Sequence, residues 1–160
     1  MRIVQTLWTA SSRLTNNSFA WPHPEFNLMS WALSCLSLKE HYDEVALYTD
    51  SEGKRILIDE LHLPYSEVYV VYDDLNCLPQ HWAMAKVMTY SIQTSPFLHV
   101  DGDVYVPQPF FDEVVTAPLV AQNREIGTIY YWRMLNNILS HKEIEIPFFI
   151  QKRLSENCNL

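Results

Sequence analysis

Two aspartates one residue apart are the sharpest chemical feature of the sequence. They stand in "FLHVDGDVYV", residues 97–106, as Asp101-Gly102-Asp103 between two apolar runs. In a regular strand, residues i and i+2 point to the same side, so both carboxylates would face one way. Gly102 has no side chain to obstruct a ligand. Carboxylate oxygens suit Mg²⁺ or Mn²⁺, which take further ligands from substrate phosphates. The motif predicts a metal-diphosphate site with Asp101 and Asp103 as metal ligands.

The same tripeptide has a plainer interpretation, as an Asp-Gly turn between two short strands. The apolar runs "FLHV" and "VYV" on either side favour the end of a buried strand, and with it the ligand-binding interpretation. His99 shares the face of the two aspartates by its spacing. It is either a partner of the carboxylates or a core histidine whose hydrogen bonds are satisfied.

Alternating strand and helix patterns lead up to this motif. The β-prone runs are 3–8, 44–50, 66–72 and 97–100, and helical spacing lies between them at 25–38, 56–61 and 82–92. This order predicts an α/β fold, a mostly parallel sheet with helices on both faces. Apolar residues also widen the face of the first helix and predict its burial; they are Phe26, Met29, Leu33 and Leu36.

In such a sheet, ligands bind outside the carboxyl ends of the strands. Thr6 to Trp8, Asp50, Asp73 and Asp101 all end predicted strands, so we expect them on one rim. After the motif, residues 118–123 predict another strand, 129–139 a helix and 143–146 an edge strand. The sequence has no repeat, linker or charge block, which predicts one domain over residues 1–160.

Composition limits the classes of function. The net charge is −8 and no Lys/Arg cluster exists to neutralise a row of phosphates, which argues against nucleic-acid binding. No apolar stretch is long enough for a transmembrane segment, and the first residues lack a signal-peptide core. Cys35, Cys77 and Cys158 share no metal-ligand spacing. These features predict a cytoplasmic protein.

The segment "PFLHVDGDVYV", preceded by a helix with Lys86 and by "VALYTDSEGKRIL", resembles the nucleotide-sugar-binding half of a GT-A type glycosyltransferase. In that family a strand ends in an Asp-x-Asp motif. The resemblance covers most of residues 2–123. It implies a GT-A, Rossmann-like fold, Mn²⁺ or Mg²⁺ as cofactor, and metal-dependent transfer of sugar from a nucleoside-diphosphate sugar to an unknown acceptor.

The resemblance also implies roles for individual residues. Asp103 would coordinate the metal, and Asp101 would lie near the ribose or reach the metal through water. The remaining donor-binding residues implied are Thr6, Leu7, Trp8, Asp50, Lys86 and Gly102. Three of them have plainer roles, because Asp50 suits a helix N-cap, Lys86 a solvated helix surface and Trp8 the core.

Little of the chain follows Asp103, whereas the family's acceptor site lies in its later half. The chain is therefore expected to be truncated on the acceptor side, a minimal enzyme, or a fragment that binds without catalysing. His141 and Glu125 are the residues considered for a third metal ligand and for the acceptor side. Two alternatives stay open. One is a haloacid-dehalogenase-like phosphohydrolase with Asp101 as nucleophile, and the other is a non-catalytic binding module.

Overall fold

The structure is a computed structural model, and it describes residues 1–10, 12–16, 19–78, 81–122, 129–141, 145 and 148. Contacts divide the chain into two compact units, Met1–Thr116 and Ala117–Leu160, and each is described by itself. The expectation of a single domain over residues 1–160 stays a prediction.

The first unit is built on a four-stranded sheet whose strands are all parallel. Its strands are β1 (Arg2–Leu7), β2 (Val45–Thr49), β3 (Glu67–Val70) and β4 (Phe97–His99). Their order across the sheet is β3-β2-β1-β4. Val4 of β1 is in register with Ala46 on one side and with His99 on the other. The α/β class and all four strands predicted before the aspartates are confirmed.

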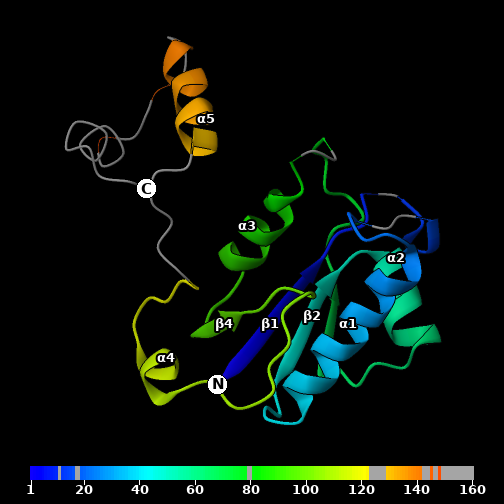
Figure 1. Cartoon of the computed structure of the whole chain (residues 1–160). Coiled ribbons are helices and arrows are strands. Elements are labelled where there is room, and N and C mark those ends of the chain that lie inside the picture. Colours follow the sequence, from blue (N-terminus) through cyan, green and yellow to red (C-terminus); the bar gives the residue numbers. More distant parts are fainter. Residues whose placement is uncertain are drawn as a thin grey trace. The chain divides into compact units, whose positions relative to one another are not determined.

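Helices cover both faces of this sheet, as predicted (Figure 1). On one face lie α1 (Pro24–Lys39) and the continuous helix formed by α2 (Ser51–Lys54) and η2 (Arg55–Glu60). Side chains from these helices bury Leu7 and Leu47 of the sheet. On the other face, Ala85 and Met88 of α3 (Ala83–Ser91) pack against the opposite side of the strands.

Helix α1 is less buried than its sequence predicts. Trp31, Cys35 and Leu38 are buried against the sheet. The four residues expected to widen this face are instead 46–64% exposed; they are Phe26, Met29, Leu33 and Leu36. The inner face takes the polar Asn27, Ser30 and Ser34 in their place. A helix that is apolar on most sides can pack against a sheet by more than one face. Here the face that turns inward is the one whose polar side chains find a place at the pocket and the turn.

The remaining elements are short or belong to the second unit. They are η1 (Leu14–Asn16), α4 (Asp112–Thr116) and α5 (Ile129–Ser140), and α5 confirms the helix predicted over residues 129–139. The strand predicted at 118–123 is wrong for residues 118–122, which form none. Leu119 is 89% exposed, so this run has no surface to pack on, and β propensity alone does not make a strand.

Three sequence predictions fall on residues that the structure does not describe. The edge strand at 143–146 lies outside them except for Glu145, which is in no strand. Glu125 and Cys158 also lie outside the described residues. None of the helices in the described part of the chain has the length and apolar character needed to span a bilayer.

Candidate functional site

A pocket of about 240 Å³ lies at the carboxyl ends of β1 and β4. The chain runs from β1 outward through β2 to β3 and returns to place β4 on the other side of β1. The pocket therefore lies where the strand order reverses, the usual ligand position in open parallel sheets. Its lining residues are Thr6, Leu7, Trp8, Phe19, Trp21, Asn27, Ser30, Trp31, Trp82, Ala85, Lys86, Asp101, Gly102 and Asp103.

Seven of the eight predicted site residues line this pocket, and Asp50 does not. Asp73, also expected on this rim, does not line the pocket and instead accepts hydrogen bonds from Ser51. The end of β1 supplies three of them, α3 supplies Lys86, and the segment after β4 supplies Asp101, Gly102 and Asp103. His141 directly follows α5 in the second unit and is described apart from the pocket.

The two aspartates stand in a turn and not in a regular strand. Strand β4 ends at His99, and the backbone N–H of Val104 donates to the carbonyl of Asp101 at 3.1 Å. The hydroxyl of Ser34 donates to the carbonyl of Val104 at 2.7 Å, and the N–H of Val106 donates to Ser37 Oγ at 3.1 Å. These bonds draw the chain along α1 instead of letting the strand continue. The turn nonetheless brings both aspartates to the pocket.

A chain of hydrogen bonds supports this turn from beneath. The Tyr65 hydroxyl donates to Gln5 Oε1 at 2.7 Å, and Gln5 Nε2 donates to Ser34 Oγ at 2.9 Å and to the Asp101 carbonyl at 3.3 Å. Burial raises the pKa of Tyr65 well above its usual value, so the phenol remains a donor. Each partner is thereby fixed as donor or acceptor. The last hydrogen bond of the series runs from the Ser34 hydroxyl to the carbonyl of Val104.

Gly102 is required by a neighbour and not only by a ligand. A Cβ added at this position would lie 2.4 Å from Cε2 of Trp31, a residue of the core. Ser30 Oγ donates to the Gly102 carbonyl at 3.0 Å on the same side. From the sequence, the space left by the absent side chain of Gly102 was expected to admit a ligand. In the structure the indole of Trp31 occupies part of that space. The absence of a side chain at Gly102 thus lets the turn pack closely against α1.

Lys86 is paired with one of the aspartates. Its Nζ lies 2.5 Å from Asp101 Oδ1, and it also lies over the Trp82 ring, 5.0 Å from the centroid. The Lys86 side chain is 22% exposed and that of Asp101 is 44% exposed. The predicted alternative of a solvated helix lysine does not describe this arrangement, because Lys86 is held between an aromatic face and a carboxylate.

His99 lies beside the same carboxylate, with its side chain 10% exposed. Its ring packs edge-on against Tyr90, and Nδ1 lies 3.7 Å from Asp101 Oδ1. Burial lowers the pKa of His99 to about 4; the carboxylate of Asp101 opposes this shift, and the ammonium of Lys86 adds to it. The ring is therefore neutral at neutral pH, and Nε2 has no hydrogen-bond partner within the described part of the chain. Of the two roles expected, His99 lies beside Asp101 as a partner would, but it is not a satisfied core histidine because Nε2 is unpaired among the described residues.

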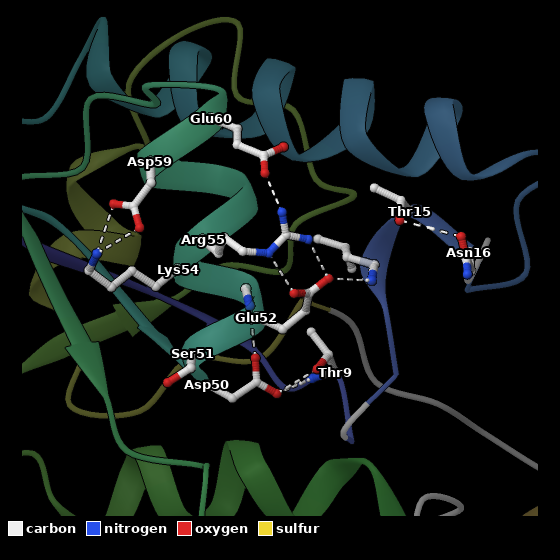
Figure 2. Close-up of polar contacts among 12 residues, drawn as sticks. Thr9, Thr15, Asn16, Asp50, Ser51, Glu52, Lys54, Arg55, Asp59 and Glu60 are labelled. Carbon is white, nitrogen blue, oxygen red and sulfur yellow. Dashed lines mark hydrogen bonds and ion pairs between the residues drawn. The ribbon is translucent and has the colours of Figure 1, made fainter.

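Asp50 holds together the loop after β1 and the start of α2 (Figure 2). Its carboxylate accepts hydrogen bonds from the Thr9 N–H at 2.7 Å, the Thr9 hydroxyl at 2.7 Å and the Gly53 N–H at 2.9 Å. Only 5% of Asp50 is exposed. The structure therefore displays the N-cap role, one of the two predicted for this residue.

Three of the pocket's residues come from the inner face of α1, which sequence reasoning did not assign to the site. They are Asn27, Ser30 and Trp31. Asn27 is only 4% exposed, yet its Nδ2 has no hydrogen-bond partner in the described residues. A buried, unpaired amide in a pocket is the donor that a polar ligand group can satisfy. Its polar character on an apolar helix, four residues before Trp31, is the signal that could have found it.

The donor set limits the metal chemistry that this pocket allows. In the part of the chain that is described, no three His, Cys, Asp or Glu side chains gather closely enough to hold a metal. Asp101 and Asp103 offer carboxylate oxygens, and the unpaired amide of Asn27 lines the same pocket. These residues fit a divalent ion that takes its remaining ligands from phosphate oxygens.

Comparisons with known proteins place the chain in a family. No curated protein and no solved structure matches it significantly. One family model matches over residues 1–160, the whole length of the chain. The chain therefore belongs to the family described as "Family of unknown function (DUF6734)".

Proposed function

We propose that the pocket binds a nucleoside-diphosphate sugar together with Mn²⁺ or Mg²⁺, as the donor site of a GT-A type glycosyltransferase. One observation carries the proposal. Asp101 and Asp103 line the same pocket as the end of β1, where the strand order of the sheet reverses. The acceptor is not identified, and the cytoplasm, predicted from the sequence, is the proposed compartment.

In this proposal, Asp103 holds the metal and Asp101 lies at the ribose or reaches the metal through water. The end of β1, Thr6 to Trp8, faces the base and ribose. Indole rings in the lining, including Trp8 and Trp82, offer flat surfaces on which a base or sugar ring can stack. The Asn27 amide donates to a polar group of the ligand.

The reaction proposed breaks the bond between the anomeric carbon and the diphosphate oxygen, forms a bond from that carbon to the oxygen of an acceptor hydroxyl, and releases the hydroxyl proton to solvent. A bound divalent metal supplies neutralisation of the charge on the leaving diphosphate. Lys86, which lines the pocket, adds a positive charge there. The two aspartates would hold the metal, and the metal in turn would hold the diphosphate end of the donor in position.

Thermal unfolding with candidate donors tests the proposal. UDP, GDP and their sugars are titrated with and without Mn²⁺, and we expect one of them to raise the Tm only when Mn²⁺ is present. A ligand at 100 times its Kd stabilises a protein by about 2.7 kcal/mol, which is easily resolved. Asp103→Asn should remove the effect.

Asp74→Asn is the matched control, because Asp74 is an exposed turn aspartate that does not line the pocket. It should keep the metal-dependent stabilisation. If no nucleotide stabilises the protein with Mn²⁺, or if Asp103→Asn responds like the native chain, the donor-site proposal is wrong. Phosphatase turnover lost in Asp101→Asn would favour the phosphohydrolase alternative instead, and silence in both assays the binding module.

A further inference from the structure

We infer that Lys86 is a built-in counter-ion that occupies Asp101 until a diphosphate withdraws it, so that metal and nucleotide enter the pocket together. The inference rests on the proposed function and assigns the coupling between metal binding and nucleotide binding at the same site. It predicts weak binding of the metal alone and mutual reinforcement between metal and nucleotide.

The first step is the ion pair itself. Lys86 Nζ and Asp101 Oδ1 are 2.5 Å apart, and Lys86 is also placed over Trp82. Both members of the pair line the pocket. A divalent ion approaching Asp101 therefore meets an ammonium already in contact with that carboxylate. The two positive charges, on the ion and on Lys86, would repel each other at so short a separation.

The second step is the lack of other ligands. Apart from Asp101, the pocket offers Asp103 as its one further carboxylate among the described lining residues. His99 Nδ1, 3.7 Å from the Asp101 oxygen, does not line the pocket. A metal without phosphate oxygens would have to bind through Asp103 and a carboxylate that Lys86 holds, and one or two carboxylates are few for Mn²⁺ or Mg²⁺.

The third step is what a diphosphate changes. Its oxygens attract the Lys86 ammonium, which has three donors on a flexible stem and can turn from Asp101 to the phosphates without moving α3. Asp101 is then free to face the metal, and the phosphates complete the coordination. Because coupling between two ligands is reciprocal, the metal strengthens nucleotide binding by the same factor.

An independent observation indicates that this pocket is built for a polar ligand. The Asn27 side chain is 4% exposed, and its Nδ2 lacks a partner among the described residues. It lines the same pocket as Lys86 and Asp101. Burying an unpaired donor costs free energy, and a ligand oxygen that accepts its hydrogen bond recovers that cost.

Titration of Mn²⁺ alone, followed by the electron paramagnetic resonance signal of the free ion, tests the inference. We expect Lys86→Met to bind Mn²⁺ about fivefold more tightly than the native chain, the factor that an ion pair of this exposure can supply. Methionine keeps an unbranched apolar stem against Trp82 while removing the charge. Lys86→Arg keeps the charge and should bind Mn²⁺ as weakly as the native chain.

Lys54→Met is the matched control. Lys54 pairs with Asp59 at 2.8 Å on the exposed surface of the helix formed by α2 and η2, and neither residue lines the pocket. Its loss should leave Mn²⁺ binding unchanged. In the native chain UDP or GDP, whichever binds, should raise the affinity for Mn²⁺ about tenfold or more, and in Lys86→Met by a smaller factor.

The outcomes separate this inference from the proposed function. If a nucleotide binds with Mn²⁺ but Lys86→Met holds Mn²⁺ alone no more tightly than the native chain, the counter-ion role is overturned and the donor site stands. Equal Mn²⁺ affinity with and without nucleotide in the native chain overturns it as well. If the native chain binds no nucleotide under any condition, the proposed function fails first. Should the methionine variant not fold, Lys86→Gln provides the same loss of charge.

Discussion

Replacing Asp50 tests whether its carboxylate stabilises the fold or binds a ligand. Asp50→Ala removes three hydrogen bonds to a carboxylate that is 5% exposed, two of them from backbone N–H groups of Thr9 and Gly53. A hydrogen bond to a charged group contributes about 1.5–3 kcal/mol, and loss of an N-cap costs about 0.5–2 kcal/mol. These contributions overlap, so we expect the free energy of unfolding to fall by about 4 kcal/mol.

Urea unfolding followed by tryptophan fluorescence measures this loss, and a nucleotide titration of the folded variant accompanies it. We expect nucleotide affinity to change little, because Asp50 does not line the pocket. Asp73→Ala is the control. Asp73 accepts hydrogen bonds from the N–H and hydroxyl of Ser51, the first residue of α2. Because Asp73 is exposed, its replacement should lower the free energy of unfolding far less. A loss below about 1 kcal/mol for Asp50→Ala, with nucleotide binding abolished, would refute the N-cap reasoning.

Three further predictions concern residues around the pocket. The pKa of His99 lies near 4 in the folded chain and at about 6.5 in the unfolded chain, so the unfolded chain binds more protons between these pH values. The free energy of unfolding should therefore fall by about 2 kcal/mol from pH 7 to pH 5. Urea unfolding should show this slope flattened in His99→Gln and kept in the exposed control His81→Gln. Gly102→Ala should cost about 1–3 kcal/mol by overpacking against Trp31, and a double-mutant cycle with Trp31→Phe should recover part of it; additive losses would contradict the contact. Asn27→Leu should raise the free energy of unfolding by about 1 kcal/mol, since it removes an unpaired buried amide, while weakening nucleotide binding measured by calorimetry; a destabilised variant with full affinity would contradict this role.

The fold was largely predictable, because the four strands and the three longer helical segments of the first unit each have a local sequence signal, whereas the short helices η1 and α4 were not predicted. Runs such as 44–50 are short, β-branched or aromatic, and end at turn formers, and they match β2 and its neighbours closely. The order β3-β2-β1-β4 was not part of that prediction, since strand order is set by contacts between residues far apart along the chain. The run at 118–122 fails for a related reason, because it has the propensity of a strand without a place on the sheet.

Half of the pocket's fourteen lining residues were predictable from the sequence, but their geometry was not. The rule that ligands bind at the carboxyl ends of parallel strands found Thr6 to Trp8 and the aspartates. It could not tell that the aspartates occupy a turn, because that depends on Ser34 and Ser37 of α1, more than sixty residues earlier. Periodicity also could not find Asn27, since helix α1 is apolar on most sides and nothing local says which face turns inward.

The hydrogen bonds beneath the turn have a consequence for how this pocket can change over evolution. They run from Tyr65 through Gln5 and Ser34 to main-chain carbonyls, and none of them uses the side chain of either aspartate. The foundation of the turn and the groups that it displays are thus encoded by different residues. Substitutions at positions 101 and 103 can alter the pocket's chemistry while its scaffold is inherited intact, so the pocket suits repurposing by evolution or by design.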